Sequence, residues 1–333
     1  MSENVTTLLG SATIAFATSF ATMVLLLRTG LAGRLAIDVP NDRSLHASPV
    51  PRVGGIAVVA GILVALLLLD LTLYAVPVAI VAMLAVVSFV DDRHSLPIAG
   101  RLVVHVIAAL SWLLYGTDYV LNWTLVPVVL VIAWTINLYN FMDGTDGLAG
   151  GMAVSGFGIF AFAAWQAGDP NLALMAVAAS AASAAFLIFN FPPARCFMGD
   201  AGSVPLGFLA AAIGSKGWID GAWPVWFPFM VFSPFIVDAT ITLFRRVFSG
   251  ARFWKPHRDH YYQRVVQMGW THRRLALAEY MLMLCVGVSA LVTLNLGPGL
   301  QILSVIVWLM IYIRLMVQID RRWRLRTVAD GPR

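Results

Sequence analysis

The chain has 333 residues, of which 60% are hydrophobic and only 12% are charged. This charged fraction is about half the ~25% of ordinary soluble domains, so the chain lacks the polar side chains needed to cover a water-exposed surface. The composition therefore excludes a soluble enzyme and favours a polytopic membrane protein. The two cysteines, Cys196 and Cys285, are too few for a disulfide framework and are expected to be packing residues.

Eleven apolar segments follow one another along the chain. They cover residues 5–27, 53–69, 72–90, 102–116, 124–141, 149–166, 172–190, 203–215, 223–244, 275–295 and 299–317. Most are long enough to cross a hydrocarbon core of ~30 Å as a helix. Segments 102–116 and 203–215 are short for a span, so the sequence predicts an all-α protein with ten or eleven transmembrane helices. No repeat or linker divides the chain, which predicts a single membrane domain over residues 1–333.

Basic residues define an orientation for these helices. With the N-terminus outside, every Lys and Arg of the 22 in the chain falls in a cytoplasmic segment, except Lys216. The site of any chemistry is then expected at the cytoplasmic face, because the outer loops are short. The net charge of +5 and the basic tail at residues 321–326 are explained by topology and anionic headgroups, so no nucleic-acid partner is expected.

Ionisable side chains inside the predicted spans are few. His105, Asp238 and Glu279 all lie close to the cytoplasmic boundary, whereas a coupled transporter is expected to place such groups near the membrane midplane. Pro234, four residues before Asp238, predicts a kink in the helix over 223–244, which could open a groove for a lipid tail. The pattern argues against transport and for an enzymatic site at the inner face.

Acidic residues gather at this predicted face in four groups. These are Asp91 with Asp92, Asp143 with Asp146, Asp200, and Asp238. Clustered carboxylates repel one another unless a cation or a basic partner is present. Hard oxygen ligands of this kind suit Mg²⁺, with Mn²⁺ as the alternative, and they share the cation with substrate phosphates.

The segment over residues 137–148 is the most informative. Asn137 and Asn140 share one face at the end of an apolar helix. Asp143-Gly and Asp146-Gly then supply a tight turn that allows close approach to a ligand. A plain turn explains the glycines, but it does not explain two asparagines followed by two carboxylates.

This NxxNxxDGxDGL segment occurs together with Asp91-Asp92 and with residues 49–55, 197–203 and 257–260. The combination resembles the polyprenyl-phosphate N-acetylhexosamine-1-phosphate transferases, a bacterial glycosyltransferase family. These integral membrane enzymes transfer a sugar 1-phosphate from a UDP-sugar to undecaprenyl phosphate and release UMP. The resemblance covers nearly the whole chain. It implies undecaprenyl phosphate, a UDP-N-acetylhexosamine and membrane lipid as partners, and a location in the bacterial inner membrane. A homodimer is left open.

The resemblance also implies roles for individual residues. Asp200 is the carboxylate closest to the cation, and Asp91 and Asp92 lie beside the lipid phosphate, where either could be the proposed base. The donor pocket is implied to contain Asn137, Asn140, Asp143, Asp146, His257 and His260. From the chemistry alone, Arg43, Arg52, Arg258 and Arg264 could add planar donors for phosphate oxygens. A base is the weakest of these roles, because a phosphate monoester is already mostly ionised at neutral pH.

The loop around His257 departs from one branch of the family. The peptidoglycan-precursor branch carries three consecutive histidines there, whereas this chain has His257-Arg-Asp-His260. The loop looks more like the branch that initiates O-antigen and lipopolysaccharide synthesis, which implies UDP-N-acetylglucosamine or a 6-deoxy relative as donor. The alternatives are a pentapeptide-bearing donor or, from another class, a flippase for lipid-linked sugars. His272 is expected to be incidental, and His105 is expected to pack between helices.

Overall fold

The computed structural model describes residues 2–40, 49–69, 71–94, 96–251 and 257–329. Helices account for almost all of its secondary structure, and a two-residue antiparallel pair of strands lies between the second and third helices. The elements are α1 (Ser2–Arg28), α2 (Leu31–Leu35), β1 (Ile37–Asp38), β2 (Val50–Pro51), α3 (Gly54–Leu69), α4 (Leu71–His94), α5 (Ile98–Tyr115), α6 (Leu125–Phe141), α7 (Leu148–Gln166), α8 (Pro170–Asn190), α9 (Asp200–Ile219), α10 (Trp226–Val231), α11 (Ser233–Phe248), α12 (Tyr261–Gln267), α13 (His272–Leu294) and α14 (Pro298–Ala329).

The predicted all-α membrane architecture is confirmed. Every predicted apolar segment coincides with a helix, except that the segment over 223–244 forms two helices, α10 and α11. Among the described residues, seven helices are long and apolar enough to cross a membrane, namely α1, α4, α5, α7, α8, α13 and α14, while α3 and α6 are shorter apolar helices. The exact number of spans and the orientation of the N-terminus remain predictions.

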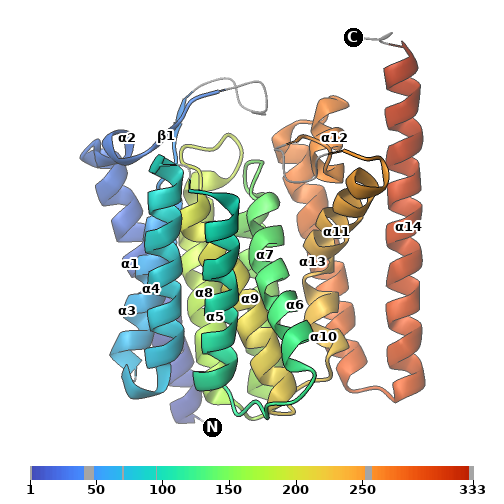
Figure 1. The fold of residues 1–333 in the computed structure, drawn as a ribbon. Helices are drawn as coiled ribbons and strands as arrows, with labels where there is room; N and C mark the ends of the chain where they lie inside the picture. The colour runs from blue at the N-terminus through green and yellow to red at the C-terminus, as the bar shows by residue number, and fades with distance from the viewer. Residues whose placement is uncertain (1, 41–48, 70, 95, 252–256, 330–333) are drawn as a thin grey trace.

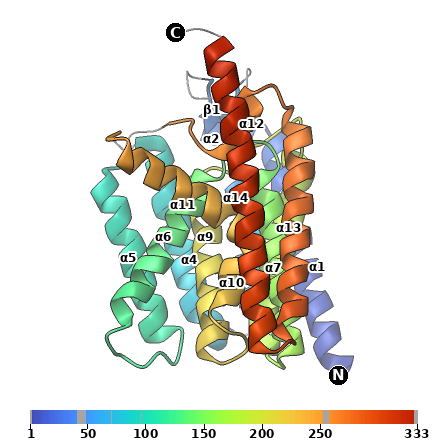
Figure 2. The ribbon, with the colours of Figure 1, turned by 90° about the vertical axis from the view of Figure 1, so that its right-hand side faces the viewer.

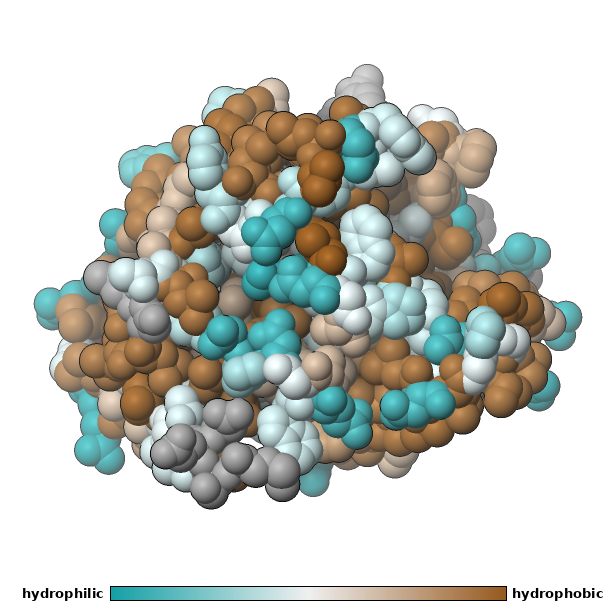
Figure 3. Space-filling model, turned by 90° about the horizontal axis from the view of Figure 1, so that it is seen from below, coloured by the Kyte–Doolittle hydropathy of each residue, from teal (hydrophilic) through white to brown (hydrophobic). Residues whose placement is uncertain are grey.

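The long helices run side by side along one axis, with the N-terminus at one end of the molecule and the C-terminus at the other (Figure 1). α2, β1 and α12 lie at the end that also carries the C-terminus, and α14 extends beyond its neighbours there (Figures 1 and 2). Seen from the opposite end, hydrophilic residues cross the middle of the face and hydrophobic residues lie on both sides of them (Figure 3). Large apolar side chains such as Leu68, Val86 and Met310 are exposed on α3, α4 and α14, so the sides of the bundle can contact lipid.

The kink predicted near Pro234 is a break between two helices. α10 ends at Val231, and Pro234 lies in the first turn of α11, where its missing N–H group costs no helical hydrogen bond. α11 leans away from the direction of α10 (Figure 2). The break brings α11 against α6, where Trp134 donates a hydrogen bond to Thr240 at 3.3 Å, so α11 can contribute to a site.

A backbone contact between α3 and α9 sets the geometry of that site. The N–H groups of Gly54 and Gly55 donate to the carbonyls of Phe197 and Met198 at 2.9 and 2.8 Å. A Cβ atom on Gly202 would lie 2.5 Å from the Cα atom of Gly55, so neither position has room for a side chain. Two segments far apart in the sequence therefore meet at the N-termini of two helices, and they bring Arg52 beside Asp200.

Candidate active site

A cavity of about 620 Å³ lies at the end of the bundle that carries α12. Helices α4, α5, α6, α9 and α11 contribute to its walls, together with the loop between α6 and α7 and the segment before α12. Its polar lining consists of Asp38, Arg52, Ser88, Asp91, Arg101, His105, Asn137, Asn140, Asp143, Thr145, Asp146, Asn190, Asp200, His257, His260, Gln263 and His272. Of the residues predicted from the sequence, Asp92, Asp238, Arg258 and Arg264 do not line this cavity, and Arg43 lies outside the described residues.

Arg52 lies at the centre of the charged part of the cavity. Its guanidinium pairs with the carboxylates of Asp92 and Asp200, with Nη2 3.1 Å from Oδ1 of Asp200. The other oxygen of Asp200 accepts a hydrogen bond from Asn140 at 3.3 Å, and Ser203 donates to the amide oxygen of Asn140 at 2.6 Å. This chain of bonds fixes the orientation of both the carboxylate and the amide.

Carboxyl groups outnumber basic groups around Arg52. Asp92, Asp143 and Asp200 surround the single guanidinium of Arg52. Burial, together with the nearby carboxylates, raises the pKa of Asp143 well above its usual range, although Arg52 opposes the shift. A site that holds this many carboxylates against one arginine fits a divalent cation.

The donor set also fits the kind of cation that was expected. Among the described residues, no group of three or more His, Cys, Asp or Glu side chains is arranged to enclose a metal ion. Mg²⁺ does not need such a cage, because it commonly takes one or two protein carboxylates and completes its octahedron with water and substrate phosphates. Asp200, whose oxygens each accept one hydrogen bond here, retains lone pairs for this purpose.

Asp91 and Asp92 point to different partners. The oxygens of Asp91 accept hydrogen bonds from the backbone N–H of Leu96 at 2.6 Å and from Arg101 at 2.9 Å, whereas Asp92 pairs with Arg52. The two residues are neighbours on α4 and so project about 100° apart. Both carboxylates are occupied by basic partners, an arrangement suited to organising charge around a phosphate.

The turn between α6 and α7 is held from several sides. Asp146 accepts a hydrogen bond from the backbone N–H of Ala194 at 3.0 Å, and its other oxygen lies 3.3 Å from Nδ1 of His272. The same imidazole nitrogen lies 3.0 Å from the hydroxyl of Thr145. Gly147 adopts a φ of 77°, which a side chain would strain, and its N–H donates to Asn190 at 2.8 Å.

Two histidines contribute more to the cavity than the sequence indicated. His272, expected to be incidental, lines the cavity and orders the aspartate turn from the first turn of α13. His105 is buried between helices as expected, but it also lines the cavity, with Nδ1 3.0 Å from the amide nitrogen of Asn137. The only sequence signal for His272 is its position in the first turn of the helix that follows the basic loop.

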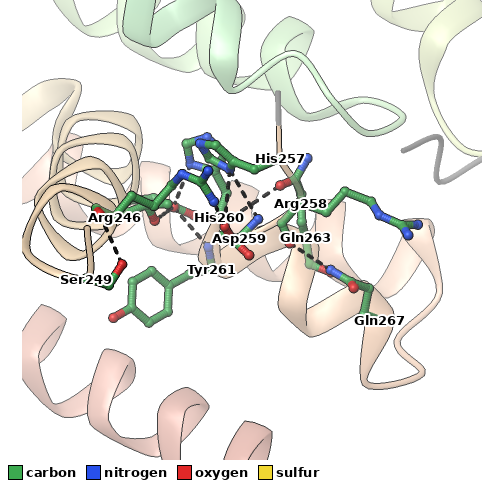
Figure 4. Close-up of polar contacts among 11 residues, drawn as sticks. Arg246, Ser249, His257, Arg258, Asp259, His260, Tyr261, Gln263 and Gln267 are labelled. Atoms are coloured by element: carbon green, nitrogen blue, oxygen red, sulfur yellow. Dashed lines mark hydrogen bonds and ion pairs between the residues drawn. The ribbon is translucent and has the colours of Figure 1, made fainter. Parts of the chain in front are cut away.

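The segment before α12 brings its two histidines to the cavity. The rings of His257 and His260 lie side by side, with centroids 5.0 Å apart, whereas the side chain of Arg258 points away from them (Figure 4). Burial, with smaller contributions from His260 and Arg246, lowers the pKa of His257 to about 4, so its ring is neutral near pH 7. Arg264, expected to reach phosphate, instead binds Asp320 of α14 at 3.1 Å.

Comparison with known proteins agrees with this arrangement. The family model for glycosyl transferase family 4 matches residues 71–217. A decaprenyl-phosphate N-acetylglucosaminephosphotransferase of Mycolicibacterium smegmatis is 30% identical, over 86% of this chain and 82% of its own length. A probable undecaprenyl-phosphate N-acetylglucosaminyl 1-phosphate transferase of Bacillus subtilis is 26% identical over 92% and 91%, and an undecaprenyl-phosphate alpha-N-acetylglucosaminyl 1-phosphate transferase of Yersinia pestis is 28% identical over 72% and 71%. With its carboxylate-rich cavity at the end of a helical membrane bundle, the chain belongs to the polyprenyl-phosphate N-acetylhexosamine-1-phosphate transferase family.

Proposed function

We propose that this protein transfers N-acetylglucosamine 1-phosphate from UDP-N-acetylglucosamine to undecaprenyl phosphate. The products are undecaprenyl-diphospho-N-acetylglucosamine and UMP. The observation that carries the proposal is the two-sided character of the cavity, which joins the cluster around Arg52 and Asp200 to an apolar wall. The printed names of the relatives, which specify undecaprenyl or decaprenyl phosphate and N-acetylglucosamine, support the same substrates.

The apolar wall suits a lipid acceptor. It is formed on α4, α5, α6 and α11 by Leu84, Val87, Leu102, Trp134 and Leu243 among others. A separate apolar cavity of about 170 Å³ lies between α6, α9 and the α10–α11 break, with Val131, Phe232 and Ile236 in its lining. The phosphate of the acceptor would lie at the charged end of the larger cavity, and its polyprenyl tail would leave along these apolar surfaces towards lipid.

The reaction needs positioning and charge neutralisation more than proton removal. An oxygen of the acceptor phosphate attacks the sugar-side phosphorus of the donor, and the bond from that phosphorus to the bridging oxygen breaks with its electron pair leaving on UMP. Arg52 can donate to phosphate oxygens, and Asn140 keeps Asp200 oriented. Asp200 would hold Mg²⁺, or Mn²⁺, whose charge would stabilise the diphosphate and the departing UMP.

The proposal also covers the cellular location of the protein and the biosynthetic step that it catalyses. The protein would lie in the bacterial inner membrane with the cavity facing the cytoplasm, where UDP-sugars are dissolved. It would then catalyse the first membrane step of a cell-surface polysaccharide of the O-antigen type. The separation of His257 from His260 by two residues favours this branch over the branch that takes a pentapeptide-bearing donor.

A donor competition assay tests the proposal. Purified protein in detergent is given undecaprenyl phosphate, Mg²⁺ and one of three donors: UDP-N-acetylglucosamine, a 6-deoxy N-acetylhexosamine analogue or UDP-N-acetylmuramoyl-pentapeptide. We expect UMP and a lipid product from the first or second donor and none from the third. Efficient use of the pentapeptide donor would overturn the branch assignment. Absence of UMP with every UDP-N-acetylhexosamine, in folded protein, would favour a flippase instead.

A further inference from the structure

Asp238 is a buried acidic residue of α11 that does not line the cavity. Its Oδ1 atom accepts hydrogen bonds from Nδ1 of His260 at 3.2 Å, from the backbone N–H of Tyr261 at 2.9 Å and from the hydroxyl of Thr242 at 3.1 Å. Its Oδ2 atom accepts from the backbone N–H of Tyr262 at 3.0 Å. One carboxylate thus binds both the first backbone N–H groups of α12 and the ring of the residue that precedes α12.

The remaining contacts of α12 show how closely this helix is docked. Tyr262 donates its hydroxyl to the carbonyl of Phe141 at 3.1 Å, next to the aspartate turn, and a Cβ atom on Gly144 would collide with that hydroxyl. On the other side, Tyr261 and Arg264 bind Asp320 of α14 at 3.3 and 3.1 Å. Asp238 and Asp320 therefore hold α12 from two sides, but Asp238 is the one that also contacts the His260 ring.

The hydrogen bond to Asp238 determines which nitrogen of His260 faces the cavity. Because a carboxylate only accepts, Nδ1 must keep its hydrogen whether the ring is neutral or protonated. Asp238 lies outside the cavity lining and His260 is part of it, so Nε2, on the opposite edge of the ring, is the nitrogen presented to the substrate. When Nε2 donates to a phosphate oxygen, the ring carries both hydrogens, and the Asp238 carboxylate compensates its charge.

We infer that Asp238 is a positioning residue, which fixes the tautomer and orientation of His260 so that Nε2 meets the diphosphate of the donor. The inference rests on the proposed function for the identity of that diphosphate. Loss of the partner that orients a metal-bound histidine commonly costs 10–100-fold, and we expect an effect of the same size for this phosphate-binding histidine. The sequence placed Asp238 among the acidic groups of the site, and its contacts assign it a different task from that of Asp200.

The first test compares Asp238→Asn with two matched variants. Asp320→Asn loosens the other anchor of α12 without a contact to His260, and Thr242→Val removes one donor from the same carboxylate. We expect Asp238→Asn to lower kcat/KM for the UDP-sugar about 10–100-fold. Both matched variants should stay within a factor of about three. Equal losses in Asp238→Asn and Asp320→Asn would show that only the docking of α12 matters and would overturn the inference.

A double-mutant cycle with His260→Gln tests whether Asp238 acts through the ring. We expect Asp238→Asn to cost little more once the ring is gone, because the two changes remove one interaction. Additive losses would contradict the inference. If Asp238→Asn does not fold, His260→Asn provides the test, since its amide can still donate to Asp238 but offers nothing at the position of Nε2. It should keep the wild-type thermal midpoint and lose turnover, and wild-type turnover would refute the inference.

Binding of UDP in the presence of Mg²⁺ separates this inference from the proposed function. If the wild-type protein releases no UMP, the proposed reaction fails, and the affinities of the same variants still test the role of Asp238. We expect Asp238→Asn and His260→Asn to weaken the binding of UDP about tenfold and to leave that of uridine unchanged. Equal losses for UDP and uridine would indicate a general distortion of the pocket and would overturn the inference.

Discussion

Two charged clusters at the same end of the molecule use the same residue types in opposite proportions. In the cavity cluster, Asp92, Asp143 and Asp200 outnumber the single guanidinium of Arg52. In the brace cluster, Arg245 and Arg264 share the single carboxylate of Asp320, at 2.7 and 3.1 Å, and connect α11, α12 and α14.

The difference follows from what each cluster meets. Excess positive charge in the brace cluster lies at a helix end where anionic headgroups are expected. The surplus carboxyl groups of the cavity cluster repel one another, which helps to raise the pKa of Asp143, so they suit a phosphate substrate only when a divalent cation joins them. The sign of the uncompensated charge, more than the number of ion pairs, therefore distinguishes the reactive site from the brace, and the predictions below test this distinction.

The largest expected effect is that of Asp200→Asn in the cavity cluster. The amide keeps the shape of the side chain but removes the charge that would hold Mg²⁺, so turnover should fall by about 1000-fold or more while the protein stays folded. UMP release at several Mg²⁺ concentrations measures the effect. Asp220→Asn, which breaks an ion pair with Lys216 of 2.8 Å outside the cavity, serves as the control and should retain full activity. Wild-type activity and Mg²⁺ dependence in Asp200→Asn would exclude it as the essential ligand.

The next effects separate Asp92 from Asp91. Asp92→Asn leaves Arg52 free to neutralise Asp200, so we expect a loss of about 100-fold and a shift of half-saturating Mg²⁺ to higher concentration. Asp91→Asn releases Arg101 at the wall near the apolar lining, so we expect a loss of about tenfold or more, mainly as a higher KM for undecaprenyl phosphate. Titrations of Mg²⁺ and of the acceptor distinguish the two, and identical profiles would show that the pairs act as one unit.

Most of the helices could be predicted from the sequence, because long apolar runs in a membrane protein have few alternatives to helix. The break between α10 and α11 was also predictable from the local sequence, because Pro234 lacks the N–H that a continuous helix needs. Much of the cavity lining was also foreseen, since Asn140, Asp143 and Asp200 belong to motifs that place several polar groups together.

The remaining features depend on contacts between distant segments. No local pattern shows that residues 54–55 lie against residues 197–202, and it is this contact that brings Arg52 within 3.1 Å of Asp200. His272 stands alone in its segment, so its approach to Asp146 became visible only with the fold. Arg258 was expected to supply planar donors for phosphate oxygens, yet its side chain points away from the rings of His257 and His260 (Figure 4).

The contact between Gly55 and Gly202 gives a prediction for stability. In Gly202→Ala the new Cβ would lie 2.5 Å from the Cα of Gly55, and a backbone atom cannot move aside as a flexible side chain would. We expect a loss of about 1–3 kcal/mol, seen as a lower thermal midpoint, and reduced turnover because Arg52 moves away from Asp200. Gly10→Ala in α1, where no atom lies within 4 Å of the new Cβ, is the control and should be neutral or slightly stabilising. An unchanged midpoint in Gly202→Ala would show that the two helices can separate without cost.

The smallest expected effect is a pH dependence of stability caused by His257, which lines the cavity. Its pKa is lowered from 6.5 to about 4 by burial, with help from His260 and Arg246, whereas in the unfolded chain the ring takes up a proton near pH 6.5. Between these values the unfolded state binds more protons than the folded state, so this ring destabilises the protein increasingly as pH falls from about 6.5 to 4. At pH 5 the cost should be about 1–2 kcal/mol, and it should vanish above pH 7.5. Thermal midpoints of the wild type and His257→Gln at pH 7.5 and pH 5 measure this cost. The midpoint of the variant should rise relative to that of the wild type at the lower pH. A constant difference would mean that the buried ring accepts a proton as readily as it does in the unfolded chain.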